Sequence, residues 1–133
     1  LNVDTIAIAP RGAKVTIIGR GITGLDPLIE SIARKSRRTI ELSSDADAFL
    51  KRQDGWVLTQ KGIPALMVGS AFADLEVLER FLSSYYHGPD DEYSKAMELG
   101  GAAEDATLHV LLGQYFANAK KYVRKIDDKK TGG

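Results

Sequence analysis

Short apolar runs alternate with longer amphipathic stretches along the chain, and this alternation is typical of a layered α/β domain. Three runs are rich in apolar and β-branched residues and are bounded by turn residues, so they predict strands over 1–9, 14–19 and 63–69. The run at 14–19 shows little alternation of apolar and polar residues, and we therefore expect both of its faces to be buried. A shorter strand is predicted over 39–42.

The stretches between these strands carry helix signals. Asp26 and Pro27 predict the N-cap and first position of one helix, and Asp74 is predicted to cap a second helix that runs through Ser83. A third, long helix is predicted over 98–125. Three smaller features complete the pattern: a loop or short helix over 43–52, a helical turn over 56–61 that Gly62 ends, and a loop over 85–93.

The composition is ordinary for a globular protein and narrows the function classes. Of the 133 residues, 44% are hydrophobic and 27% are charged. Lys and Arg together number 18, as do Asp and Glu, so the chain lacks the basic excess expected of a nucleic-acid-binding protein. Cysteine is absent, which excludes disulfides and cysteine-ligated metals. No apolar run reaches the roughly 20 residues of a membrane span, and we expect neither nucleic acid nor a membrane as a partner.

A glycine motif follows the predicted strand at 14–19. Gly19, Gly21 and Gly24 match the GxGxxG pattern, and Glu41 lies near the position of a ribose-binding acid, which together suggest a dinucleotide site. However, Asp26 would compete with a phosphate for the amides at the start of the helix. The dinucleotide-binding domain is therefore kept only as the weaker alternative.

Two residues are candidate metal ligands on their own context. Asp4 is a carboxylate within an apolar run, and acids are rarely buried unless they are paired or bind a metal. His87 lies in a loop of Gly, Pro and acidic residues, where a histidine is either exposed or liganded. From the residues alone, a solvent-facing acid on an edge strand is as well supported for Asp4 as a metal ligand. A loop histidine such as His87, taken alone, is more often a surface residue. His109 lies within the long predicted helix, where a structural role is expected.

Three segments, at 1–4, 60–66 and 86–91, resemble the zinc aminopeptidase family of two-zinc exopeptidases in their order and spacing. The resemblance extends over about 1–122. It implies a partial three-layer α/β/α sandwich with a mixed, largely parallel sheet. It also implies a zinc-dependent metallopeptidase that hydrolyses peptide bonds at chain ends, with two zinc ions as cofactors and a peptide as substrate.

The same resemblance assigns roles to individual residues. It implies that Asp4 is a ligand of one zinc ion and that His87 is the imidazole ligand of the other. Tyr86 is the residue expected to polarise the tetrahedral intermediate, and Asp54 a supporting carboxylate behind the metal ligands. Gly55 stands where the family has a histidine that is not a metal ligand, which leaves the local hydrogen bonding open.

Four further residues that the family requires lie upstream of the strand that carries Asp4, and they have no counterpart here. They are a His-x-Asp pair and a Glu-Glu pair, which supply metal ligands and the general base. We therefore expect 1–126 to be the C-terminal part of such a catalytic domain, excised or processed, with a flexible tail over 127–133. Without its N-terminal half as partner it would be inert.

The alternative is a non-catalytic interaction or scaffold domain of this fold. Many bacterial members of the family are exported, but the sequence leaves the compartment open.

Overall fold

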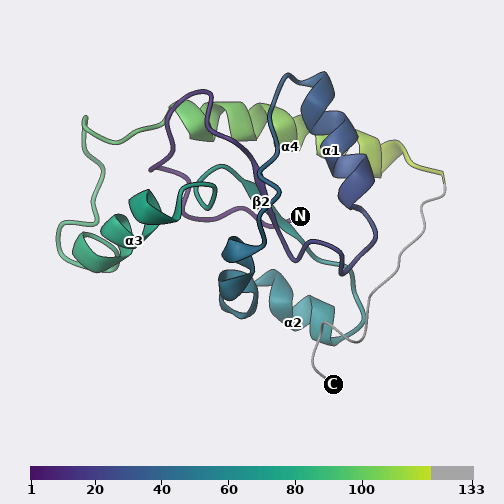
Figure 1. Ribbon diagram of the computed structural model, residues 1–133, viewed down its shortest axis with the longest axis horizontal. Coiled ribbons are helices and arrows are strands. Elements are labelled where there is room, and N and C mark those ends of the chain that lie inside the picture. Colours follow the sequence, from purple (N-terminus) through teal and green to yellow (C-terminus); the bar gives the residue numbers. More distant parts are fainter. Residues whose placement is uncertain (121–133) are drawn as a thin grey trace.

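The structure, a computed structural model, describes residues 1–120 and contains two short strands and several helices (Figure 1). The predicted tail at 127–133, and the predicted end of the long helix, lie outside the described residues. In chain order the elements are β1 (Thr16–Ile18), α1 (Asp26–Lys35), the 3-10 helix η1 (Asp45–Arg52), α2 (Gly55–Gln60), β2 (Met67–Gly69), α3 (Leu75–Ser84) and α4 (Gly100–Asn118).

The two strands pair with each other in an antiparallel sense, with Ile17 opposite Val68. Two single bridges extend this small sheet: Asn2 pairs in parallel with β2, and Val15 pairs in parallel with Ile40. The sheet is thus mixed, and the predicted segments 1–9, 14–19 and 63–69 do meet in it. A largely parallel sheet in a three-layer sandwich is not confirmed; the structure establishes a mixed α/β fold.

All four predicted strands are shorter than expected. Those over 14–19 and 63–69 retain the three residues of β1 and of β2, and the other two are reduced further. The strand over 1–9 is reduced to the bridge at Asn2, and the strand over 39–42 to the bridge at Ile40. Thr5 adopts a φ of 54°, a left-handed conformation that ends extended backbone. Within the described residues no bridge pairs the segment 3–9 with another strand. Its β-branched residues therefore do not form a strand, although their composition favours one.

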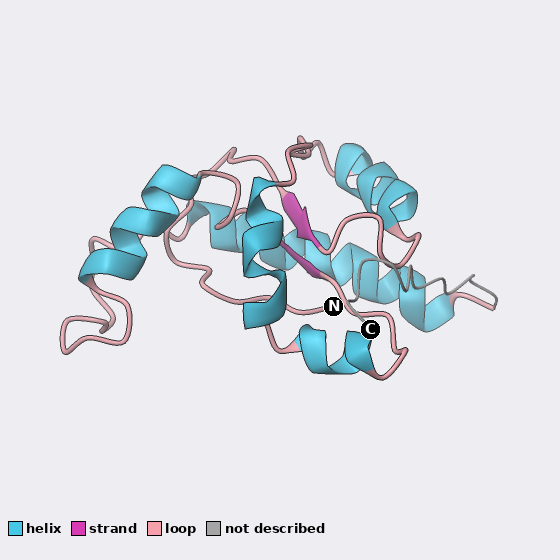
Figure 2. Cartoon of the chain, turned by 60° about the horizontal axis from the view of Figure 1, so that its bottom comes forward, coloured by secondary structure: helices cyan, strands magenta, loops and turns pink. Residues whose placement is uncertain are grey.

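Helices cover both faces of the sheet, and the strand side chains alternate between them (Figure 2). The cross-strand pair Ile17 and Val68 packs with α1 and α4, whereas the pair Ile18 and Met67 packs with η1 and α3. All side chains of β1 are buried, as the lack of alternation predicted. Two hydrophobic clusters therefore hold the sheet between the helices.

The two predicted N-caps have different outcomes. The Asp74 carboxylate accepts a hydrogen bond from the Val77 amide at 3.1 Å, which confirms it as the cap of α3. Helix α1 begins at Asp26, one residue before the predicted start at Pro27; its N-cap residue is Leu25, and no side chain caps it. The Asp26 carboxylate turns back instead and accepts from the Gly21 amide at 2.8 Å.

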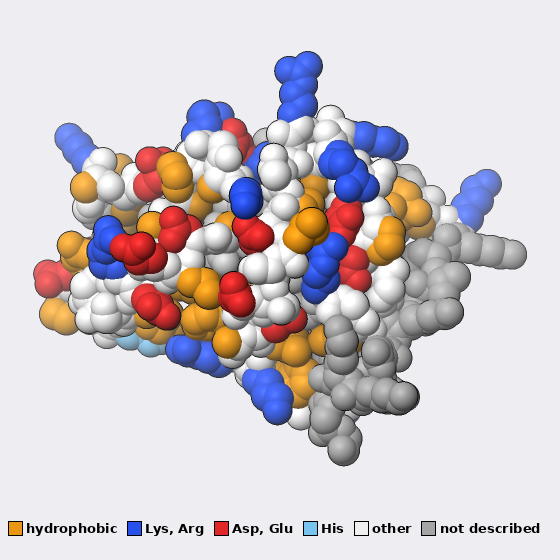
Figure 3. Space-filling view, in the orientation of Figure 1, with side chains coloured by type: hydrophobic (Ala, Val, Ile, Leu, Met, Phe, Trp, Pro, Cys, Tyr) orange, Lys and Arg blue, Asp and Glu red, His pale blue; other side chains and the backbone are white. Residues whose placement is uncertain are grey.

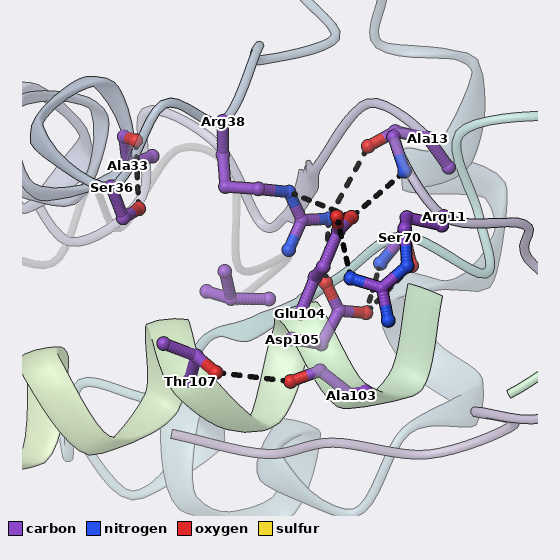
Figure 4. Close-up of polar contacts among 12 residues, drawn as sticks. Arg11, Ala13, Ala33, Ser36, Arg38, Ser70, Ala103, Glu104, Asp105 and Thr107 are labelled. Atoms are coloured by element: carbon purple, nitrogen blue, oxygen red, sulfur yellow. Dashed lines mark hydrogen bonds and ion pairs between the residues drawn. The ribbon is translucent and has the colours of Figure 1, made fainter. Parts of the chain in front are cut away.

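A buried ion pair joins α4 to the end of β2 and to the turn after α1 (Figure 4). Asp105 accepts hydrogen bonds from an Arg38 guanidinium nitrogen at 2.9 Å and from the Ser70 amide and hydroxyl, both at 2.7 Å. Beside it, Glu104 accepts from the Gly12 amide at 2.8 Å. Because Asp105 and Arg38 are both buried, this network orients α4 against the sheet.

Candidate functional site

Asp4, Tyr86 and His87 line the same cavity, although Asp4 is far from the other two in the sequence. The cavity has a volume of about 610 Å³ and lies between the segment 4–8, α3 and the loop that follows α3. A smaller pocket of about 40 Å³ shares Asp4 and Tyr86 with it and is also lined by Gln53. The fold therefore places three of the four predicted site residues along one cavity.

Asp4 lies in the loop that leaves the sheet after Asn2, and its side chain is exposed. One carboxylate oxygen accepts the Thr5 amide at 2.6 Å, a contact that holds the carboxylate next to its own backbone. Thr5 is β-branched, and its positive φ is a genuine conformational outlier. Asp4 is thus an exposed acid at the cavity. The interpretation of Asp4 as a buried carboxylate is wrong.

His87 and Tyr86 form a stacked pair at the start of the loop after α3. Their ring centroids are 3.9 Å apart with an interplanar angle of 19°, and the Tyr86 ring also meets Phe81 edge to face at 5.8 Å. His87 has a φ of 57°, and its amide donates to the Asp91 carboxylate at 2.9 Å. The imidazole is exposed but held by its neighbours, which restricts the orientations it can adopt.

The cavity is strongly acidic. Among the described residues, its lining holds one Arg or Lys, Arg80, against five carboxylates: Asp4, Asp90, Asp91, Glu92 and Glu98. Several acidic side chains also gather over α3 and the following loop at the left end of the surface in Figure 3. Such a field attracts cationic groups and raises their local concentration.

The described residues alone do not make a zinc site. A catalytic zinc ion takes three protein ligands and a structural one takes four. Within residues 1–120 no group of three or more His, Cys, Asp or Glu side chains is close enough to hold a metal ion. Asp4 and His87 are donors of the right chemistry, but further ligands would have to come from another protein segment.

The fourth predicted residue, Asp54, lies apart from the cavity. It is exposed at the N-cap position of α2, makes no capping hydrogen bond, and lines neither of the two pockets described above. Its neighbour Gly55 donates its amide to the Gln53 side-chain oxygen at 3.0 Å. A β-carbon at Gly55 would lie 2.6 Å from that oxygen and 3.0 Å from the β-carbon of Ala65, so a histidine here would have to displace the Gln53 side chain.

Gln53 was not singled out from the sequence, although it is central to this region. Its side-chain oxygen also accepts from the Asn2 amide group at 3.3 Å, and so connects α2 to the segment that carries Asp4. Glutamine is an ordinary surface residue in most sequences, and its position before Asp54 and Gly55 was the only available signal.

His109 behaves as expected, because its Nε2 lies 2.6 Å from the Val68 carbonyl oxygen inside the fold.

Two of the three glycine amides of the motif are already paired with carboxylates. The Gly19 amide donates to the Asp47 carboxylate at 3.1 Å, and the Gly21 amide donates to Asp26. A pyrophosphate would have to displace two carboxylates from the backbone groups that it needs. This arrangement disfavours the dinucleotide alternative.

Comparisons with known proteins add no assignment: no family model, no curated protein and no solved structure matches this chain. Among the described helices, none combines the length and the apolar character required to cross a membrane.

Proposed function

We propose that this chain forms part of the active site of a zinc-dependent exopeptidase of the aminopeptidase type. In this proposal Asp4 and His87 each contribute one ligand to a pair of zinc ions, and Tyr86 binds the reacting carbonyl group. The observation that carries the proposal is that these three residues, selected from the sequence for these roles, line one cavity.

Backbone strain at the same cavity supports the proposal. Three residues other than glycine have a positive φ within the described chain: Thr5, Arg37 and His87. Two of them line the cavity, one next to Asp4 and one being the proposed imidazole ligand. Such conformations cost about 1–3 kcal/mol each and cluster at functional sites.

Tyr86 is suited to act on a substrate. Its ring stacks on the His87 imidazole and meets the Phe81 ring edge to face, so its phenol group is oriented before a substrate arrives. A phenol O–H can donate a hydrogen bond to a carbonyl oxygen as negative charge develops on it. Zinc would polarise the same carbonyl when it is bound.

The proposal requires ligands beyond the described residues, because Asp4 and His87 are fewer than a catalytic zinc ion takes. We therefore expect the 133-residue chain, given zinc alone, to show no turnover of aminoacyl-nitroanilides. Zinc-dependent turnover that persists through repeated purification would contradict this arrangement.

The decisive experiment uses the gene product that contains this sequence, expressed from its own start codon and loaded with zinc. We expect zinc-dependent release of N-terminal residues, which His87→Ala and Asp4→Asn each lower by at least about 100-fold because each removes or weakens a metal ligand. Asp45→Asn is the matched control, since Asp45 is an exposed acid on η1 that lines neither pocket. Undiminished turnover in His87→Ala would refute the proposal.

A non-catalytic interaction domain is the second candidate, and the surface of α4 favours it. Its two charged residues, Glu104 and Asp105, both belong to the network with Arg38. Val110 and Tyr115 remain 58% and 41% exposed on this helix. This candidate predicts that the gene product has no zinc-dependent turnover and that Asp4 and His87 can be replaced without consequence.

A further inference from the structure

We propose that Gln53 is a positioning residue that places Asp4 in the cavity. The inference rests on the proposed function, because it gives Asp4 the role of a metal ligand. Gln53 itself is 5% exposed, and its side-chain oxygen joins Asn2, two residues before Asp4, to the first turn of α2.

Asn2 is the last residue that the sheet holds before Asp4. Its amide donates to the Leu66 carbonyl at 2.7 Å, and its own carbonyl accepts from the Val68 amide at 3.3 Å. Val3 and Asp4 are then exposed, and Thr5 turns into the left-handed region. The position of Asp4 is therefore set by how firmly Asn2 is anchored.

Gln53 provides the side-chain part of that anchor. Its oxygen receives two donors, the Asn2 side-chain amide at 3.3 Å and the Gly55 backbone amide at 3.0 Å. Both donors require an acceptor, which determines which end of the Gln53 amide faces them. Because a β-carbon at Gly55 would overlap the oxygen, this arrangement depends on glycine at that position.

Gln53 also shares a pocket with two of the proposed reacting groups. It lines the small pocket of about 40 Å³ together with Asp4 and Tyr86. A shift of the Gln53 side chain would consequently change the wall that these two residues share, without any contact between Gln53 and a substrate in the larger cavity.

The test compares three variants whose side chains are of similar size. Gln53→Met removes the acceptor, Gln53→Glu retains an acceptor oxygen for Asn2 and Gly55, and Gln60→Met is the control at an exposed position of α2. The first readout is the ¹⁵N order parameter of the Thr5 amide in the 133-residue chain. We expect a fall from about 0.85 to below about 0.6 in Gln53→Met only.

The second readout is the zinc affinity of the zinc-loaded gene product, measured by competition with a chelator. We expect Gln53→Met to weaken zinc binding by about 10–100-fold, with Gln53→Glu restoring most of the loss. A general loss of stability would not be rescued in this way. Should Gln53→Met fail to fold, Asn2→Ala removes the donor of the same hydrogen bond and is expected to give the same fall at Thr5.

The outcomes separate the two proposals. Equal Thr5 order parameters in Gln53→Met and Gln60→Met would overturn the positioning role, whatever the activity of the gene product. A selective loss of order at Thr5, in a gene product that binds no zinc and cleaves no peptide, would support the placement of Asp4 by Gln53 and overturn the peptidase proposal instead.

Discussion

The buried ion pair between Arg38 and Asp105 is where a single substitution should destabilise the fold most clearly. Asp105→Asn keeps the shape of the side chain but removes its charge. Arg38, whose side chain is 7% exposed, would then keep only its longer ion pair with Glu104, at 3.8 Å. The Ser70 amide and hydroxyl at present both donate to Asp105. The side-chain NH2 group of the new Asn would place a further donor near these two.

The expected magnitude follows from the geometry. Breaking a buried ion pair by removing one partner costs about 3–5 kcal/mol. In a chain of this size that loss lowers the melting temperature by on the order of 10 °C. Arg38→Met should cost less, because two buried Arg38 nitrogens, Nε and Nη1, have no hydrogen-bond partner among the described residues. The loss of these two nitrogens in Arg38→Met therefore breaks no hydrogen bond.

Urea unfolding of the single variants and of the double variant Arg38→Met/Asp105→Asn measures the coupling. We expect the double variant to be more stable than the sum of the two losses implies, by about 1 kcal/mol or more, because no unpaired charge remains buried. Arg80→Met is the control, since Arg80 pairs with Glu76 on the exposed surface of α3, and its effect should stay within about 0.5 kcal/mol. Strictly additive losses would refute the idea that the charges stabilise each other.

Three further predictions concern local features. A β-carbon at Gly101 would lie 2.6 Å from a backbone oxygen, whereas one at Gly113 would meet nothing within 4 Å. Thermal unfolding should therefore show that Gly101→Ala destabilises by about 1–3 kcal/mol and that Gly113→Ala stabilises by up to about 1 kcal/mol. The hydrogen bond from Lys14 lowers the pKa of Glu41 below its usual value. The ionised carboxylate therefore stabilises the folded chain at pH values above its unfolded-state pKa. That stabilisation is lost as the pH falls through the lower folded-state pKa. Lys14→Met should raise that pKa in an NMR titration; an unchanged midpoint would mean that the contact is absent in solution. Asp74→Ala should cost about 1 kcal/mol in urea unfolding through the loss of the α3 cap, and a neutral effect would argue against the cap.

Features that depend on neighbours along the chain were predictable from the sequence. Three such features follow from backbone preferences of single residues: the start of α1, to within one residue of Pro27, the cap of α3 at Asp74 and the turn at Gly62. The burial of β1 on both faces also followed from its pattern. These signals are local because they arise from one residue and the few residues next to it.

Features that depend on distant partners were decided only in three dimensions. The antiparallel pairing of β1 with β2 and the shortness of the first strand depend on which segments lie side by side, and β-branched composition does not encode this. Asp26 binds a glycine amide in the preceding turn instead of capping its own helix, because the folded turn brings that amide within reach.

The candidate site divides in the same way. Asp4, Tyr86 and His87 could be selected from the sequence because their motifs are local, but that they line one cavity is a property of the fold. The pair Arg38–Asp105 carries no local signal, and the only local signal for Gln53 is its position before Asp54 and Gly55. Buried polar groups must find hydrogen-bond partners wherever the chain brings them together, so their roles appear only when the tertiary structure places donor beside acceptor.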